Sequence, residues 1–537
     1  MLTQRSFWIL LISALVLPAL GIAAFLWRRH YRDQDGNTAR RVFKNSAIPT
    51  AMRMAVRALD LLFAFVLYDA MSGADMGKYT LAALLIVNYL STFTDFGLGV
   101  LLTREVAKDS AHANKLFGAT LALRLVLVVL AFPIVAFVIG IYNTLSSIGV
   151  GEAISSMGQE ALWVLTLTLI PAAFSNAVTA LYNASERMEI PAAMELVTAI
   201  VNNLARITVL MLHGSIVDLS WVAVGVTTFT ALVYLGLQLR DFFPPRLVWE
   251  RALIWGMVPL ALPLMLNNML NAVFFRFDTF IVKAFGGGQG DLMVQQYNAA
   301  YQITSIAAII PSVVTFAVFP VMARKSGGDR QGLAAAQNRT LQMLLLVAFP
   351  VTVGIFALAP DLIRMISGKN AASYLPISGL VLALLAWYLP LSFVNGLLQY
   401  VLIAINQQRS ITKAFVLGAV FNLAANLIGI PFFGLYAAAV VTVLSEIVLL
   451  AVFMPLLRRE GLAPPLRALM WRPGLAALVM GAAMLAAHAA LAPLVGWLGA
   501  SVAAGAVAVV VYPAMLWLLG AVGPEERALV LRVLGRS

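Results

Sequence analysis

The sequence predicts an all-α polytopic membrane protein, and three observations support that fold class. Hydrophobic residues make up 61% of the 537 residues and charged residues 11%, whereas about a quarter of a soluble globular domain is charged. The mean hydropathy is +0.91. Most apolar runs reach about 20 residues, long enough to cross a ~30 Å hydrocarbon core as helices, and the alternating ~10-residue segments of a transmembrane β-barrel do not occur.

The apolar runs predict fifteen membrane-spanning helices, with boundaries accurate to a few residues. Two of the runs are long and contain prolines, which remove backbone hydrogen bonds and bend helices. We expect Pro259 and Pro263 to bend the eighth span, and Pro311 and Pro320 to bend the ninth. The expected spans are 7–27, 47–71, 79–103, 116–141, 161–183, 192–212, 219–239, 256–285, 292–323, 340–360, 375–403, 411–430, 433–456, 473–493 and 497–520.

The loop charges predict the orientation of the chain. Assigning the loops alternately to the two sides places 27 of the 36 Lys and Arg residues on one side and 5 on the other. Basic loops remain in the cytoplasm, so the amino terminus is expected outside and the carboxyl terminus inside. The same bias accounts for the net charge of +12, and we expect no nucleic-acid partner.

The first apolar run, 7–27, is interpreted as a reverse signal anchor. No small-residue cleavage site follows it, and its basic flank, Arg28 and Arg29, lies on the carboxyl side. Trp8 and Trp27 would lie at the two membrane interfaces. A cleaved signal peptide and an overlong start of the chain stay open as alternatives.

A faint internal repeat predicts two lobes of six helices each. An even number of helices per lobe makes the repeats parallel, related by an axis along the membrane normal. Residues pair at a near-constant offset: Asp60 with Asp278 and Tyr79 with Tyr297 at 218, Arg104 with Arg324 at 220, and Arg187 with Arg409 at 222. The expected segments are an anchor and basic linker at 1–45, lobes at 46–245 and 246–458, and two further helices with a tail at 459–537.

Seven charged residues within the expected spans are candidates for function, because an ionised group deep in the membrane is costly and normally faces a partner or a cavity. Arg57 and Asp60 share a helix face and can pair, although Arg57 could also reach the cytoplasmic interface. Arg124 and Arg206 have no acidic neighbour within a turn, so each needs an anion from another helix or from a substrate. The full set is Arg57, Asp60, Arg124, Arg206, Arg276, Asp278 and Glu446.

Asparagine side chains recur at four-residue spacing within the spans, as at Asn422 and Asn426 or at Asn267 and Asn271. Residues at this spacing share a helix face. Such amides either hold helices together or line a wet lumen, and we favour the first interpretation.

Several kinds of chemistry have no support in the sequence. The stretch GADMGKYT at 73–80 differs from a phosphate-binding loop, because three residues separate its glycines and Tyr79 stands where Ser or Thr would hold Mg²⁺. The chain has no cysteine, its four histidines are scattered, and no loop is long enough for a catalytic domain. The sequence therefore predicts a transporter and not an enzyme, with no catalytic residue, cofactor or metal site.

Three stretches resemble a known family. TDFGLGVLLTREVAKD at 94–109, FRFDTFIVKAFGGGQGDLMVQQYNAAYQI at 275–303 and IIPSVVTFAVFPVMAR at 309–324 are similar to the oligosaccharide flippases of the multidrug/oligosaccharidyl-lipid/polysaccharide exporter superfamily. The resemblance covers about 46–520. It implies fourteen core helices, with two lobes around a central V-shaped cavity and two extra carboxyl-terminal helices. The amino-terminal span departs from this pattern.

The resemblance also implies a function. It predicts that the chain flips undecaprenyl-pyrophosphate-linked oligosaccharides across the bacterial plasma membrane by alternating access, for surface polysaccharide biosynthesis. The cavity cations would be Arg57, Arg124, Arg206 and Arg276, which suit a diphosphate. Proton coupling would fall to Asp60, Asp278 or Glu446, with nothing to choose among them. Expected partners are the lipid-linked substrate, membrane lipids and possible polymerase and glycosyltransferase enzymes, with the protein itself a monomer.

Three alternatives stay open. A lipid II flippase and an ion-coupled drug antiporter belong to the same superfamily. The antiporter is disfavoured because the seven candidate charges comprise four cationic and three acidic side chains. A membrane scaffold that recruits polysaccharide enzymes is a different class of protein, and the cations without a neighbouring acid argue against it.

Overall fold

The computed structural model describes residues 38–521, and within that range it is helical and contains no strand. Nine stretches of these residues are long and apolar enough to cross a membrane, which confirms the all-α polytopic fold class. The count of fifteen spans and the internal repeat stay predictions. The expected anchor at 7–27 and most of its basic linker lie outside the described residues.

The chain divides into two compact units, and the boundary between them falls between Gln295 and Gln296. The expected segment boundaries at 245/246 and 458/459 stay predictions. The helices of the first unit are α2 (Thr38–Ala70), α3 (Gly73–Leu84), α4 (Ser91–Asp95), α5 (Leu98–Lys108), α6 (Ala113–Ser147), α7 (Ser156–Thr166), α8 (Leu169–Ala184), α9 (Glu189–Met211), α10 (Ile216–Asp241), α11 (Arg251–Arg276) and α12 (Asp278–Ala284), with α13 (Gly290–Ala307) crossing the boundary. A π-helical turn, Leu85–Leu90, joins α3 to α4.

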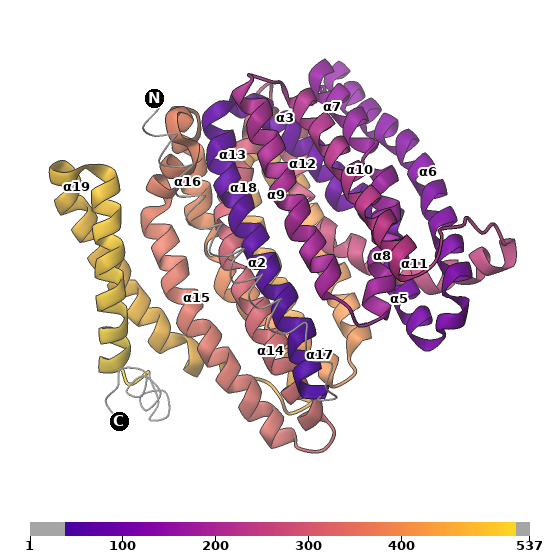
Figure 1. Ribbon diagram of the computed structural model, residues 1–537. Coiled ribbons are helices and arrows are strands. Elements are labelled where there is room, and N and C mark those ends of the chain that lie inside the picture. The colour runs from indigo at the N-terminus through magenta and orange to yellow at the C-terminus, as the bar shows by residue number, and fades with distance from the viewer. Residues whose placement is uncertain (1–37, 522–537) are drawn as a thin grey trace. The chain divides into compact units, whose positions relative to one another are not determined.

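Helices of the first unit pack in pairs. The long α2 runs beside α9 (Figure 1), α5 packs against α8, and α10 packs against α7, α8 and α9. A hydrophobic core lies between helices of the first unit. It contains small and β-branched side chains, such as Ala131, Val135 and Ala161, which are completely buried. In a membrane the hydrophobic effect does not drive helices together, and small residues stabilise their association by allowing close packing.

The span expected at 79–103 is broken in the middle. Phe96 and Gly97 both have positive φ angles, +53° and +73°, and they separate α4 from α5. A Cβ at Gly97 would lie 2.6 Å from Leu264 Cβ and 2.8 Å from the Ala261 carbonyl oxygen of α11. Glycine is therefore required here both for the left-handed conformation and for the close approach of α11.

Four other expected spans are also divided: 161–183, 256–285, 292–323 and 375–403. The run 256–285 becomes α11 and α12, separated at Phe277. The run 292–323 becomes α13 and α14, separated at Ala308. Pro311 follows the second break closely, and a proline lacks the N–H that would bond the carbonyl four residues earlier.

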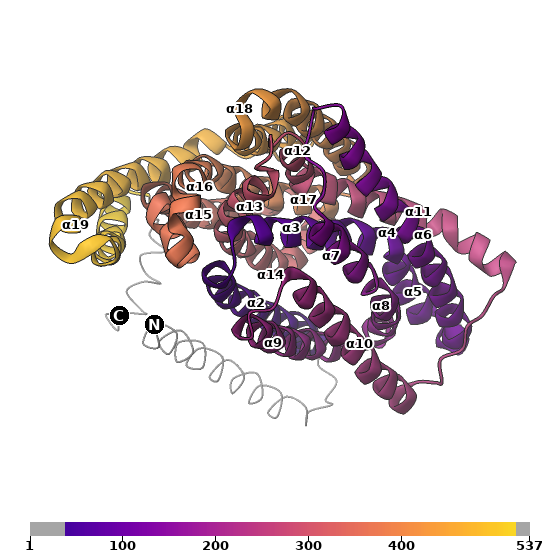
Figure 2. The same cartoon turned by 90° about the horizontal axis from the view of Figure 1, so that it is seen from above.

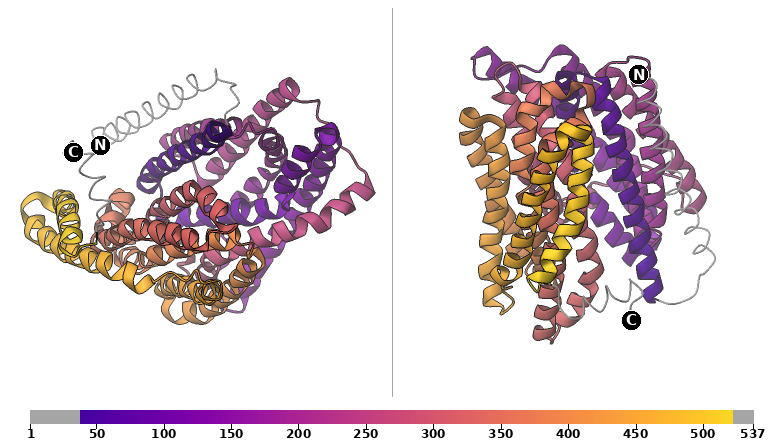
Figure 3. Two further views of the ribbon diagram at one scale, coloured as in Figure 1. Left: turned by 90° about the horizontal axis from the view of Figure 1, so that it is seen from below. Right: turned by 90° about the vertical axis from the view of Figure 1, so that its left-hand side faces the viewer.

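The second unit consists of long helices, two of which fold back on themselves. α18 leaves helical geometry at Gly434 and α19 at Gly496, both with positive φ. Figure 2 and the right panel of Figure 3 show α18 (orange) and α19 (yellow) each as two limbs. The helices are α14 (Ile309–Ser326), α15 (Arg330–Ser367), α16 (Ala371–Leu385), α17 (Tyr388–Ala404), α18 (Gln408–Arg459) and α19 (Leu466–Leu518). Within this unit α15 packs against α16, α17 and α19.

Candidate functional site

Three of the seven candidate charges lie together in the first unit. Asp60 of α2 accepts a hydrogen bond from Asn203 Nδ2 of α9 at 3.5 Å. The positive charges of Arg57 and Arg206 both act on the Asp60 carboxylate. The two helices bring these residues together because α2 and α9 run side by side.

Aromatic rings hold the guanidinium of Arg206. Arg206 Nη2 donates to the Tyr79 hydroxyl at 2.7 Å. The Arg206 guanidinium carbon lies 5.6 Å from the ring centres of both Phe63 and Tyr79, within cation–π range. Arg206 Nε is buried and has no hydrogen-bond partner among the described residues.

We call this group the Arg206 cluster. It combines two guanidinium groups with one carboxylate, so one positive charge is in excess. Arg57 is exposed, while Asp60 and Arg206 are half-buried, so an anion can reach the cluster without unfolding it. Its members are Arg57, Asp60, Phe63, Tyr79, Asn203 and Arg206.

Arg124 lies apart from this cluster and has a partner inside the protein. Its side chain is completely buried, and Nη2 lies 2.6 Å from Asp95 Oδ1, with Nη1 bonded to the Ala173 carbonyl at 3.4 Å. The sequence left open whether its anion comes from another helix or from a substrate, and the structure supplies Asp95 at the end of α4. A role for Arg124 in binding substrate stays a prediction.

The remaining candidates are Arg276, Asp278 and Glu446. Arg276 is half-buried at the end of α11, and Asp278 is buried at the start of α12, where its carboxylate accepts the Thr279 N–H at 2.8 Å. In the second unit Glu446 is 2% exposed and accepts a hydrogen bond from Asn395 Nδ2 at 2.7 Å. Their roles in substrate binding and ion coupling stay predictions.

The amides of α18 behave as expected for groups that hold helices together. Asn426 Nδ2 donates to Asn422 Oδ1 at 3.0 Å, and Asn422 Nδ2 donates to the Ser445 hydroxyl at 3.0 Å. Because Gly434 separates the two limbs of α18, the second bond joins one limb to the other. In the first unit Asn271 bonds instead to the carbonyl of Asn267 in its own helix.

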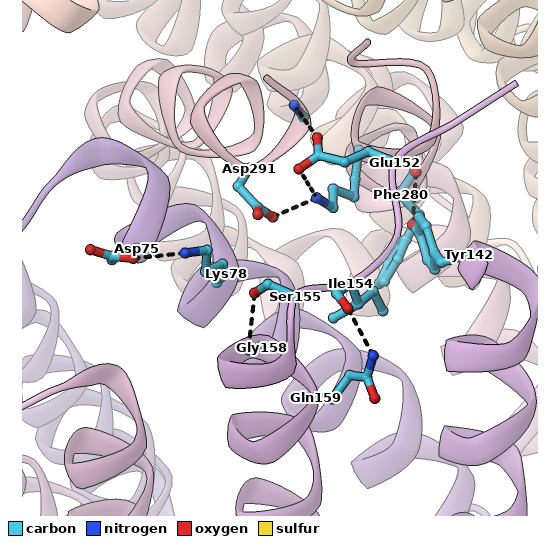
Figure 4. Close-up of polar contacts among 12 residues, drawn as sticks. Asp75, Lys78, Tyr142, Glu152, Ile154, Ser155, Gly158, Gln159, Phe280 and Asp291 are labelled. Atoms are coloured by element: carbon cyan, nitrogen blue, oxygen red, sulfur yellow. Dashed lines mark hydrogen bonds and ion pairs between the residues drawn. The ribbon is translucent and has the colours of Figure 1, made fainter. Parts of the chain in front are cut away.

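The sequence reasoning missed one buried ionic group, which we call the Lys283 triad: Glu152, Lys283 and Asp291. Glu152 and Asp291 lie 3.0 Å and 2.8 Å from the Lys283 ammonium group. Figure 4 shows the two carboxylates turned toward one nitrogen atom. Lys283 is completely buried. Lys283 and Asp291 flank the glycine-rich stretch 286–290, but Glu152 lies more than a hundred residues earlier, so no local pattern could join the three.

No group of three or more His, Asp or Glu side chains in residues 38–521 is placed to hold a metal ion. The Arg206 cluster and the buried ionic groups carry charges that can interact with anions and protons.

Comparison with known proteins finds a family model and a relative that match the sequence. A family model described as "Polysaccharide biosynthesis protein" matches residues 70–376, more than half of the chain. The "Probable low-salt glycan biosynthesis flippase Agl15" of Haloferax volcanii is 28% identical over 153 residues, covering 28% of this chain and 32% of that relative. The chain thus aligns with about a third of the relative's length.

Solved structures show the same fold. A lipid II flippase, MurJ, in an inward closed conformation has a TM-score of 0.68 at 13% identity, covering 91% of this chain and all of that one. An inward-facing multidrug resistance MATE transporter of the MOP superfamily scores 0.57 at 17% identity, covering 74% and 94%. A MOP superfamily transporter from Pyrococcus furiosus scores 0.56 at 15% identity, covering 78% and 96%. These likenesses confirm the transporter fold expected from the sequence.

Proposed function

Because the chain belongs to the polysaccharide biosynthesis protein family, we propose that it is a flippase for a lipid-linked oligosaccharide. The substrate would be an undecaprenyl-pyrophosphate-linked unit, moved by alternating access across a bacterial plasma membrane for surface polysaccharide assembly. The amino terminus would lie outside and the carboxyl terminus in the cytoplasm, as the loop charges predict. Polymerase and glycosyltransferase partners would supply and consume the substrate.

The observation that carries the proposal is the environment of Arg206. Its guanidinium is held by the Tyr79 hydroxyl and two rings, yet its Nε still lacks a partner among the described residues. A planar guanidinium in a fixed orientation binds phosphate oxygens in pairs, which gives both energy and specificity. The cluster's excess positive charge favours a diphosphate over a cationic drug.

A cationic group within a membrane segment also explains how a diphosphate could cross. The bare anion pays a large desolvation cost in hydrocarbon, and a fixed counter-charge offsets part of it. The lipid tail of such a substrate can stay in the bilayer while its head passes through the protein. Alternating exposure of a central site to the two sides of the membrane would then complete the transfer.

Reconstitution tests this function directly. The purified full chain would be placed in liposomes that contain undecaprenyl-pyrophosphate oligosaccharide in one leaflet, and appearance of the sugar in the other leaflet would be measured with a sugar-cleaving enzyme. We expect the wild-type protein to raise the flipping rate above that of empty liposomes. Equal rates with and without protein would exclude the oligosaccharide flippase. If lipid II is tried in parallel with the same result, only the drug antiporter and the scaffold remain.

A matched pair of variants tests the site. Arg206→Ala should abolish most of the stimulated flipping, whereas Arg467→Ala removes the same charge from an exposed position of α19 and should leave the rate unchanged. If Arg206→Ala folds and flips as the wild type does, the Arg206 cluster is not the substrate site.

A further inference from the structure

The Lys283 triad is built from three segments of the first unit that are far apart in the sequence. Glu152 lies in the connection between α6 and α7, Lys283 is on α12, and Asp291 begins α13. The second oxygen of Glu152 accepts the N–H of Gly290 at 2.7 Å, so this carboxylate ties the connection both to α12 and to the start of α13. Figure 4 shows the three segments converging on one point.

Close backbone packing fixes this convergence. A Cβ at Gly290 would lie 2.5 Å from the Lys283 carbonyl oxygen and 2.8 Å from Glu152 Oε2. A Cβ at Gly77 of α3 would overlap the backbone of Asp291, at 1.6 Å from its carbonyl oxygen. The segments that carry the triad therefore meet in close backbone contact, which only glycine at positions 77 and 290 permits.

The enclosed charges do not balance. Two carboxylates share one ammonium group, which leaves one negative charge in excess at a place where Asp291 is 9% exposed and Glu152 is 24% exposed. A buried charge without a partner is costly, and proteins commonly remove the cost by binding a proton.

The described elements packed around the triad do not supply the missing positive charge. The further cation that acts on Asp291, Lys78 of α3, is paired with Asp75 at 2.8 Å, so together they add no net charge. From α6 the Tyr142 hydroxyl faces the same region but donates to the Phe280 carbonyl at 2.9 Å. Figure 4 shows the Asp75–Lys78 pair beside the triad.

The geometry distinguishes the two carboxylates. Glu152 is ion-paired with Lys283 and also accepts the Gly290 N–H, and it is the more exposed of the two. Among the described residues, Asp291 has only Lys283, and it is the more buried. Burial and fewer hydrogen bonds both favour the neutral form of a carboxyl group, so the proton goes to Asp291. Burial raises the pKa of Asp291; Lys283 and Lys78 oppose this shift, and the negative charge of Glu152 adds to it.

A metal cation does not fit the same place. The ammonium group of Lys283 lies against both carboxylates and would repel a second cation, and hard cations such as Ca²⁺ require six or more oxygen ligands. We propose that Asp291 is a proton-binding site within the Lys283 triad, and that binding and release of this proton is coupled to transport. The coupling of the proton to transport rests on the proposed flippase function, whereas proton binding itself does not.

The chemical step is a simple exchange. A proton from water adds to a carboxylate oxygen of Asp291, giving a neutral acid beside the Lys283–Glu152 ion pair. In this form Asp291 holds the ammonium through a neutral oxygen, so its link to α12 is weaker. On release of the proton the carboxylate again competes with Glu152 for Lys283. The proton therefore sets how tightly the start of α13 is tied to α12.

Infrared difference spectroscopy on the full-length protein in detergent tests proton binding. The carboxylic-acid C=O stretch would be followed through a pH titration of the wild type, Asp291→Asn and Glu160→Gln, the last removing an exposed carboxylate from α7. We expect a band that titrates above the range of exposed carboxyl groups in the wild type and in Glu160→Gln, and its loss in Asp291→Asn. The same band in Asp291→Asn would overturn the proposal.

A second variant keeps the test decisive if Asp291→Asn does not fold. In Glu152→Gln, Lys283 belongs to Asp291 alone, so the band should titrate at a lower pH than in the wild type. An unshifted band would show that Asp291 does not share Lys283 and would contradict the proposed site.

Transport in proteoliposomes tests the proton coupling separately. Flipping with and without a pH gradient would be compared in the wild type, Asp291→Asn, Glu160→Gln and Glu446→Gln. We expect only Asp291→Asn to lose the stimulation by the gradient while keeping ungated flipping. If Asp291→Asn keeps full stimulation, the proton is not coupled to transport, although the flippase function stands. If the wild type does not flip the lipid at all, the proposed flippase function is wrong. The infrared result still decides whether Asp291 binds a proton.

Discussion

Arg124 and Asp95 form an ion pair across 2.6 Å, and the arginine side chain is completely shielded from the surroundings. The pair joins the end of α4 to the middle of α6, next to the break at Phe96 and Gly97. A Cβ at Gly99 would lie 3.2 Å from Asp95 Oδ1 and 3.5 Å from Arg124 Nη2, so the start of α5 also packs against the pair. The broken helix is thus held in place by charge as well as by packing.

Removing one partner of this pair should destabilise the fold strongly. Asp95→Asn leaves the Arg124 guanidinium buried without a counter-charge, a change that costs on the order of 3–5 kcal/mol in buried pairs. We expect a lower melting temperature in detergent, measured by the loss of monodisperse protein on heating. Arg104→Ala breaks a pair whose arginine is 50% exposed, and such surface pairs contribute about 0–1 kcal/mol. Equal melting temperatures for the two variants would contradict the structural role of Asp95.

Gly77→Ala should disrupt the first unit. The added Cβ would lie 1.6 Å from the Asp291 carbonyl oxygen, which is backbone and has no side-chain freedom to move away. Overpacking typically costs about 1–3 kcal/mol, and we expect at least that here. The readouts are the yield of folded protein and its melting temperature.

The matched control is Gly140→Ala. Gly140 lies within α6, and no atom of the described residues comes within 4 Å of the position that a Cβ would occupy there. Alanine is preferred in helix interiors, so this variant should be neutral or stabilised by about 0.5–1 kcal/mol. A wild-type yield for Gly77→Ala would mean that α3 and the start of α13 are not in contact.

Asp329 makes the stability of α15 depend on pH in acid solution. Its carboxylate caps α15 by accepting the Gly332 N–H at 2.7 Å, and Lys325 lies 3.2 Å away. The Gly332 N–H and the Lys325 ammonium hold the pKa of Asp329 below its usual value of 3.8. Since the folded pKa is depressed, the contribution is present above pH 3.8 and is lost as the pH falls through the folded value.

Asp329→Asn keeps a capping oxygen without the charge, so the melting temperature of the variant should lie below that of the wild type at neutral pH. The difference should disappear as the pH falls below 3.8. A difference that stays constant into the acid range would show that the charge of Asp329 does not stabilise α15.

Tyr79→Phe tests how the Arg206 cluster orients its guanidinium. The variant keeps the ring beneath the charge and removes the hydroxyl that accepts the 2.7 Å bond from Arg206. Hydrogen bonds to charged groups contribute about 1.5–3 kcal/mol, so flipping should slow by roughly tenfold or more. Arg206→Lys should recover less than half of the wild-type rate, because a lysine cannot bind phosphate in the paired manner of arginine. Wild-type rates in both variants would argue against a fixed guanidinium at the site.

The fold class was accessible from the sequence because twenty-residue apolar runs and loop charges are local properties. The breaks in the helices were less accessible. Pro311 lies three residues after the interruption at Ala308, whereas the interruption at Phe277 has no proline near it. The break at Phe96 required knowledge of α11, whose backbone leaves room only for a glycine at position 97.

The candidate site was partly predictable for the same reason. Arg57, Asp60 and Arg206 stand out as charges in apolar runs, and the structure brings the three together. Asp95 was overlooked because it lies close to polar residues near a pair of glycines, although it is the partner that Arg124 needed. The Lys283 triad depends on contacts between distant segments, which composition and spacing do not encode.

The turns of α18 and α19 determine which parts of the second unit water can reach. Phe432 and Phe433 precede Gly434 and are 77% and 69% exposed, and Leu494, before Gly496, is 77% exposed. Aromatic and aliphatic side chains at the end of a membrane hairpin favour the lipid interface over bulk water. We therefore expect these two turns to lie in the headgroup region, where proteases, antibodies and hydrophilic labelling reagents should find no protruding segment.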